Sequence, residues 1–269
     1  MLRRTGRGKE ERDDDMSKLL MKNVPTLSYS TEEAINRLRV NLNFLGTDIR
    51  KIMLISANEN EGKSFVAMHL WRQVAESGVH CVLVDGDMRK SVLVEKYQME
   101  AADGGELRGT SHVLADKTPM KEAVWQTELE QGDLLPNTEN VVNPTVLLEG
   151  KHFQNILEEM TGTYRYVFVD VPPLEMVSDG EKIGSMCDGA ILIVRSGKTS
   201  RKEVRNSIQL LERAGCPLLG VVLNRVDQAD PGETRRWTAY FREKGYAVLE
   251  ANAKGGAGTA QFAAAVREL

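Results

Sequence analysis

The sequence has 269 residues, of which 41% are hydrophobic and 28% are charged. This is the composition of an ordinary globular protein, and the length suits a single α/β domain with tails. The net charge of −4 offers no basic footprint for nucleic acid, so no nucleic-acid partner is expected.

The two ends of the chain differ in composition from the middle. Residues 1–29 begin with a basic run and three aspartates and have little apolar surface to bury, so they are predicted to form a disordered tail. Residues 251–269 are predicted to be a flexible Gly-rich segment followed by a short C-terminal helix at Gln261 to Glu268. The domain is therefore expected to occupy residues 30–250.

Two features bear on the location in the cell. No stretch approaches the ~20 apolar residues needed to cross a bilayer, so no direct membrane span is expected. Cys81, Cys187 and Cys216 are far apart and lack Cys-x-x-Cys spacing, which argues against a zinc site and a disulfide framework. Both features predict a cytoplasmic protein.

The middle of the chain alternates between helical and strand patterns. Residues 32–44 have apolar positions at helical spacing, with Ser30 or Thr31 available as a cap. Residues 51–56 form a short apolar run, and a largely buried helix is expected to begin at Lys63.

Four more apolar runs follow, at residues 79–84, 166–169, 190–194 and 218–223, and Leu134-Leu135 is expected to add a short strand. Continuous rather than alternating apolar runs indicate strands that are covered on both faces. The predicted fold class is therefore α/β, with a mostly parallel sheet and helices on both faces. Ligands bind at the carboxyl edge of such sheets, so the polar residues that end the runs are expected to converge there. These residues are Asp85, Asp87, Asp170 and Asn224.

The segment from Ser56 to Ser64 lies between a predicted strand and a predicted helix, which is the context of a phosphate-binding loop. The predicted α/β fold is therefore that of a P-loop NTPase. Backbone N–H groups at a helix start point at anionic oxygens, Lys63 supplies a charge to the β and γ phosphates, and the Ser64 hydroxyl suits Mg²⁺. The alternative is an ordinary exposed turn. The residues expected to bind the nucleotide here are Asn60, Glu61, Gly62, Lys63, Ser64 and Phe65.

Acidic residues end two of the predicted strands. Asp85 and Asp87 are two residues apart, so in an extended segment they point the same way. Beside a polyphosphate they suit Mg²⁺ binding and the acceptance of a proton from an attacking hydroxyl, although a solvated turn with a local ion pair is the alternative. Asp170 has the position that helps to hold Mg²⁺ in phosphate-loop enzymes. The predicted catalytic residues are thus Lys63, Asp85, Asp87 and Asp170, with Ser64, Asp87 and Asp170 as metal ligands.

Three segments together resemble the bacterial tyrosine kinases of capsule and exopolysaccharide synthesis, the CpsD/CapB type that also forms the cytoplasmic part of Wzc-like proteins. Residues 61–64, 82–90 and 164–173 are similar to the Walker A, Walker A′ and Walker B segments of that family. The resemblance covers roughly Glu32 to Asp227. Further collinear segments that share it are residues 143–148, 177–179, 188–199 and 219–227.

The resemblance implies an ATP-dependent protein-tyrosine kinase that acts on itself or on a partner and regulates polysaccharide synthesis and export. It implies that Lys63 binds the phosphates of ATP, that Ser64 and Asp87 coordinate Mg²⁺, and that Asp170 completes the metal site through water. Asp85 is then the base that activates a tyrosine hydroxyl. Asn224 falls where related nucleotide-binding proteins contact adenine, although a strand-terminal Asn that caps a turn fits as well.

The family also implies partners. These are a membrane-bound activator of the chain-length-determinant type, which recruits the kinase to the inner face of the cell membrane, and further copies of the chain in a homo-oligomer.

The chain departs from the family pattern at several positions. Glu59-Asn60 replaces a Pro-Gly pair in the loop, so that two acids, Glu59 and Glu61, lie close to the expected polyanion and predict weaker nucleotide affinity. Ser91 stands in place of a proline. Asn36 replaces the first arginine of a Glu-x-x-Arg-x-x-Arg motif associated with ring-like self-assembly, which puts that assembly in doubt.

The C-terminal region departs further, because family members typically end in a phosphorylated tyrosine cluster. The last 30 residues of this chain contain only Tyr240 and Tyr246. Together with Trp237 and Phe241, these tyrosines are predicted to be core residues of a final helix and strand. The sequence therefore predicts nucleotide binding without predicting a site of autophosphorylation.

Two other functions remain open. A MinD/ParA-like ATPase shares the fold and the acidic strand ends, but such proteins carry an extra lysine four residues before the last glycine of the loop, where this chain has Asn58. A non-catalytic scaffold of the polysaccharide export machinery fits the acidic loop and the lack of tyrosines near the C-terminus.

Overall fold

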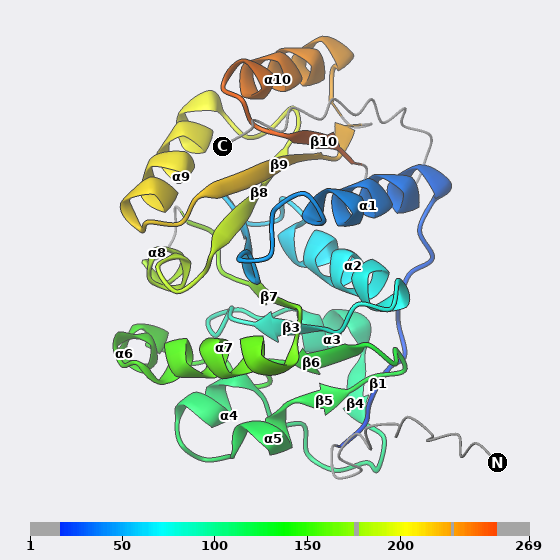
Figure 1. Ribbon diagram of the computed structural model, residues 1–269, viewed down its shortest axis with the longest axis vertical. Helices are drawn as coiled ribbons and strands as arrows, with labels where there is room; N and C mark the ends of the chain where they lie inside the picture. The colour runs from blue at the N-terminus through cyan, green and yellow to red at the C-terminus, as the bar shows by residue number, and fades with distance from the viewer. Residues whose placement is uncertain (1–16, 175–177, 227–228, 252–269) are drawn as a thin grey trace, which may run out of the picture.

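The computed structural model describes residues 17–174, 178–226 and 229–251 (Figure 1). Within these residues, eight strands form one sheet in the order β10-β9-β8-β2-β7-β3-β6-β5. All neighbouring strands are parallel except β5 and β6, which form an antiparallel pair at one edge. The strands of this sheet are β2 (Lys51–Ser56), β3 (Cys81–Asp85), β5 (Trp125–Gln126), β6 (Gly132–Leu135), β7 (Tyr166–Asp170), β8 (Gly189–Arg195), β9 (Leu218–Asn224) and β10 (Val248–Glu250).

Helices cover both faces of the sheet (Figure 1). Because alternate residues of a strand point to opposite faces, β2 supplies Met53 and Ile55 to one buried core and Ile52 and Leu54 to the other. Helices α1 to α3 pack into the second core, and α4 to α10 pack into the first. The helices are α1 (Tyr29–Leu42), α2 (Lys63–Glu76), α3 (Leu93–Tyr97), α4 (Thr110–Leu114), α5 (Met120–Ala123), α6 (Pro144–Glu149), α7 (His152–Thr163), α8 (Asp179–Gly184), α9 (Arg201–Arg213) and α10 (Pro231–Glu243).

The predicted α/β fold is confirmed by this arrangement, and the short strand expected at Leu134-Leu135 is present as β6. The strand register explains why the polar strand ends meet. Asp85 at the end of β3 pairs with Asp170 at the end of β7, and Arg195 of β8 pairs with Asn224 of β9. The site is therefore built on the carboxyl edge of a parallel sheet.

The N-terminal boundary differs from the sequence-based expectation. A strand, β1 (Leu19–Met21), pairs antiparallel with β4 (Met99–Ala101), and Leu19 is buried. The ordered fold thus begins before residue 30, because a three-residue strand gains its burial from a partner about 80 residues away along the chain. Residues 1–16 of the expected tail, and the expected helix at residues 261–268, lie outside the described residues.

The first helix also begins earlier than predicted. Its N-cap is Ser28, whose hydroxyl accepts a hydrogen bond from the Thr31 backbone N–H, so the expected caps Ser30 and Thr31 are wrong. Ser28 has the extended backbone that a capping residue needs, whereas Ser30 and Thr31 already lie within the helix.

None of the helices in the described ranges is long and apolar enough to cross a membrane.

Candidate active site

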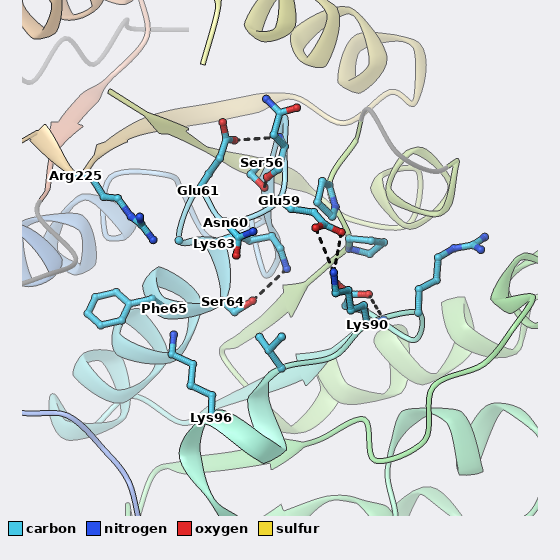
Figure 2. Close-up of a pocket in the computed structure, with 17 residues that line it drawn as sticks. Ser56, Glu59, Asn60, Glu61, Lys63, Ser64, Phe65, Lys90, Lys96 and Arg225 are labelled. Atoms are coloured by element: carbon cyan, nitrogen blue, oxygen red, sulfur yellow. Dashed lines mark hydrogen bonds and ion pairs between the residues drawn. The ribbon is translucent and has the colours of Figure 1, made fainter. Parts of the chain in front are cut away.

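A pocket of about 420 Å³ opens at the carboxyl edge of the sheet, between the loop that follows β2 and the segment that follows β3 (Figure 2). This volume is in the range of small-molecule sites. All six residues expected to hold the nucleotide at the loop, Asn60 to Phe65, line it, and Asp87 lines it as well.

The loop has the backbone shape that a phosphate site requires. Gly62 is the N-cap of α2 and has a φ of 94°, and Asn60 has a φ of 61°. Glycine adopts this left-handed conformation at little cost, and asparagine tolerates it better than most residues. Asn60 therefore holds a left-handed conformation in this loop without a glycine. The first N–H groups of α2 are left at the pocket, where they suit an anion.

Lys63 forms the centre of the buried part of the site. Its Nζ donates to Asp170 Oδ1 at 2.6 Å and to Ser64 Oγ at 3.3 Å, and the latter contact is drawn in Figure 2. The Lys63 and Asp170 side chains are only 8% and 2% exposed. Burial raises the pKa of Asp170, and the ammonium of Lys63 opposes that rise. The structure therefore brings the predicted phosphate-binding lysine and the predicted acidic strand end into direct contact.

Asp85 is fully buried beside this pair. Its carboxylate accepts hydrogen bonds from Ser91 Oγ, from the Asp87 N–H at 3.2 Å and from the Asn137 N–H at 3.4 Å. Burial and the neighbouring Asp170 raise the pKa of Asp85 to about 8. A carboxyl with a pKa near neutrality has the basicity that a general base needs. Ser91, in place of the family's proline, adds a hydroxyl that lowers this pKa.

The donor set at the pocket fits Mg²⁺. Within the described residues, no three His, Cys, Asp or Glu side chains are grouped as a metal site. Mg²⁺ does not need such a cage, because it keeps several waters and binds through one or two carboxylates and the phosphates of a substrate. Asp87 and Ser64 both line the pocket and offer hard oxygen ligands, whereas Asp170 is held by Lys63.

The two acids of the loop each have partners. Glu61 is buried, and its carboxylate accepts hydrogen bonds from the Asn58 N–H at 3.2 Å and from Thr199 Oγ1. Burial raises the pKa of Glu61. Glu59 lies within 3.3 Å of the Lys90 ammonium at the exposed rim (Figure 2). Both acids therefore have partners within the chain, which are neutral donors for Glu61 and a cation for Glu59.

Three of the predicted residues, Asp85, Asp170 and Asn224, are buried and do not line the pocket themselves. Asn224 lies on the side of the phosphate loop that faces β9. Its Nδ2 donates to the Glu61 carbonyl at 2.7 Å, and its Oδ1 accepts from the Arg225 N–H at 2.9 Å. Asn224 thus anchors the phosphate loop from β9, and its contact with adenine stays a prediction.

Cations that the sequence analysis did not assign to the site line the pocket as well. Arg225 and Phe65 lie on one side of it, with Lys96 near Phe65, and Lys90 lies on the other side (Figure 2). The Lys96 ammonium is 5.2 Å from the centre of the Phe65 ring, a cation–π contact. Isolated cations on a helix or after a strand carry no sequence signal, which is why the sequence analysis missed them.

Arg89 joins three segments that the sequence analysis could quote only as family motifs. Its Nε donates to Asp179 Oδ2 at 2.5 Å, and its Nη2 donates to Thr145 Oγ1 at 3.2 Å. The Thr145 hydroxyl in turn donates to Asp179 Oδ1 at 2.9 Å. This network ties the segment after β3 to α6 and α8 beside the pocket.

The last tyrosines are part of the core, as predicted. Trp237 and Phe241 of α10 are buried in the first core, and the half-buried Tyr240 and Tyr246 pack against it. Burial raises the pKa of Tyr246.

The chain is similar in sequence to known tyrosine-protein kinases. No family model matches the chain. The tyrosine-protein kinase CpsD of Streptococcus agalactiae is 29% identical over 199 residues, which cover 74% of this chain and 85% of that protein. The tyrosine-protein kinase YwqD of Bacillus subtilis is 29% identical over 194 residues, which cover 71% of this chain and 80% of YwqD.

Solved structures give the same result. The kinase domain of the Escherichia coli tyrosine kinase ETK superposes with a TM-score of 0.65 and 27% identity, covering 71% of this chain and 74% of that domain. The septum site-determining protein MinD of Pyrococcus horikoshii, in complex with Mg-ADP, has a TM-score of 0.58 and 20% identity, over 70% of this chain and 76% of that one, and shares the fold. In both sequence and structure, the chain is thus similar to bacterial tyrosine kinases of the CpsD and CapB type.

Proposed function

We propose that the chain transfers the γ-phosphoryl group of ATP to a tyrosine hydroxyl of a protein in the capsule or exopolysaccharide machinery, and thereby regulates synthesis and export. The observation that carries the proposal is the contact of Lys63 with Asp170, next to Asp85. Lys63 is the first residue of α2, so this contact lies at the N-terminus of that helix. A buried ammonium and free N–H groups on one side, with carboxylates on the other, suit a triphosphate and its magnesium.

Each side chain has a distinct task in this proposal. Lys63 and the first N–H groups of α2 bind the β and γ phosphates. Ser64 and Asp87 would hold Mg²⁺, with Asp170 behind them, and the ion would neutralise charge on the phosphates. The tyrosine oxygen attacks the γ phosphorus, the bond to the ADP oxygen breaks, and Asp85 accepts the tyrosine proton.

The alternatives have weaker support. Asn58, at the position of the extra lysine of MinD-like ATPases, donates from its side chain to Glu203 Oε1 at 3.1 Å, so it serves a contact within the chain. The scaffold alternative rested on the acidic loop and on the few tyrosines near the C-terminus. The partners found for Glu59 and Glu61 weaken the first of these two grounds.

We further propose that the chain binds a membrane-bound activator of the chain-length-determinant type, that this activator recruits it to the inner face of the membrane, and that the chain associates with further copies of itself.

The test is incubation of the protein with Mg-ATP and the cytoplasmic segment of the activator, followed by phosphotyrosine detection and by calorimetry of Mg-ATP binding. We expect both binding and phosphotyrosine. Binding without phosphotyrosine on any substrate supports the scaffold, and an absence of binding refutes the proposal.

A further inference from the structure

The tyrosines of residues 1–269 can be compared as possible acceptors of phosphate by how far each one is exposed to solvent. The described residues include all six of the chain's tyrosines, and they differ widely in exposure. Tyr29 is 80% exposed, whereas three tyrosines are buried and two are half-buried. The buried ones are Tyr97, Tyr164 and Tyr166, and the half-buried ones are Tyr240 and Tyr246.

The buried tyrosines cannot be acceptors in the folded protein. The Tyr164 hydroxyl donates to Asp133 at 2.7 Å, and the Tyr166 hydroxyl donates to the Leu42 carbonyl at 3.1 Å. A phosphate on either one would break a buried hydrogen bond and place charge within the core. Only a solvent-facing hydroxyl can enter the pocket of a kinase while the fold stays intact.

Tyr29 occupies a position that tolerates phosphate. It is the first residue of α1, directly after the cap Ser28, and the buried face of that helix is formed by Ala34, Ile35 and Leu38. A phosphate here removes no core contact. Negative charge is also favourable at a helix N-terminus, where the unpaired N–H groups lie.

The charge around Tyr29 complements that of the pocket. Glu32 and Glu33 follow Tyr29 in the sequence. The residues that line the pocket include five cations, Lys63, Arg89, Lys90, Lys96 and Arg225, against three acids, Glu59, Glu61 and Asp87. An acidic acceptor segment is attracted to a basic rim, which speeds encounter and favours its binding.

Tyr29 does not line the pocket of its own chain. It cannot swing into that pocket, because α1 is held in place by its packing against α2. We propose that Tyr29 is a phosphoacceptor that enters the pocket of a second copy of this chain, an inference that rests on the proposed kinase function. The Tyr29 oxygen forms a bond to the γ phosphorus of ATP, the bond to the ADP oxygen breaks, and the Tyr29 proton passes to Asp85 of the copy that acts as the enzyme.

The experiment separates the enzyme copy from the acceptor copy. The enzyme is the full chain with Tyr29→Phe, and the acceptor is the full chain with Lys63→Met, which retains Tyr29 and carries a tag. The two are mixed with Mg-ATP, and phosphorylated peptides of the tagged copy are mapped by mass spectrometry. Matched acceptors carry Lys63→Met with Tyr29→Phe, or Lys63→Met with Tyr240→Phe. A random Glu-Tyr copolymer serves as an independent substrate.

We expect phosphate on Tyr29 of the acceptor, at least tenfold less phosphate when Tyr29→Phe is present, and no change with Tyr240→Phe. Phosphorylation of the copolymer without phosphate on Tyr29 overturns the inference and leaves the kinase function standing. Phosphate on Tyr240 or Tyr246 instead overturns it as well. All reactions contain the cytoplasmic segment of the activator. If wild-type protein then phosphorylates neither the copolymer nor Tyr29, the kinase function itself fails.

Discussion

Two ion pairs of opposite environment flank the pocket. Lys63 and Asp170 lie in the protein interior, whereas Lys90 and Glu59 lie at the rim with side chains that are 71% and 36% exposed. A buried pair is costly to break because the remaining charge loses its partner without gaining water, whereas a surface pair contributes little. Breaking the buried ion pair is therefore expected to lower the stability of the fold much more than breaking the exposed one.

Lys63→Met should give the largest effect. It removes the charge proposed to bind the phosphates, so the phosphotransfer rate should fall by at least about 100-fold. It also leaves Asp170 buried without its cation, which should lower the free energy of unfolding by roughly 3 kcal/mol. Kinase assays and urea unfolding measure the two quantities separately. In the double variant Lys63→Met with Asp170→Asn, stability should partly return while activity should not.

His69 tests the buried side of the comparison with a group that lacks any ion-pair partner. It is buried on α2 with its Nε2 unpaired among the described residues, and burial, with Arg72 and Lys96 nearby, lowers its pKa from 6.5 to about 4. Between these pH values the unfolded chain binds the proton more tightly than the folded one. Stability should therefore be complete above pH 6.5 and fall by about 3 kcal/mol as the pH drops to about 4. The free energy of unfolding of His69→Gln should depend less on pH across that range than that of the wild type. An equal dependence on pH in the two proteins would contradict the assignment to His69.

Thr199→Val tests the loop acid that faces inward. Thr199 Oγ1 accepts from the Arg195 N–H at 3.1 Å and donates to Glu61, so valine leaves the carboxylate without that donor near the phosphates. The Kd for Mg-ATP should rise roughly tenfold, the value of one hydrogen bond to a charged group. Calorimetry should show that Thr199→Ser is near wild type and that Glu61→Gln in the Thr199→Val background restores most of the affinity. An unchanged Kd would show that Thr199 has no part in shaping the site.

Lys90→Ala should produce the smallest change. Breaking an exposed pair should cost at most about 1 kcal/mol of stability, and raising the salt concentration to about 1 M should erase the difference. A loss as large as that of Lys63→Met, measured in the same unfolding assay, would invalidate the distinction between the two sides of the pocket.

The sheet and the main acids were predictable from the sequence because burial on both faces leaves a local mark. Apolar runs that end in Asp85, Asp170 and Asn224 revealed parallel strands and the edge at which they meet. Contacts between loops leave no such mark. Glu61 and Thr199 are 138 residues apart, and nothing in either segment indicates that their side chains meet. The anchoring role of Asn224 was missed for the same reason, because its partner is a backbone carbonyl of another loop.

The N-terminal strand has a consequence for solubility. The Gln126 N–H of β5 donates to the Ser17 carbonyl at 3.1 Å, and Lys18 forms a bridge to Gln126, so the segment leading into β1 shields the last strand of the large sheet. Bare edge strands recruit the strands of other molecules. A chain that starts at residue 30 would expose this edge and the core residues that Leu19 covers. It would therefore be prone to aggregate during refolding.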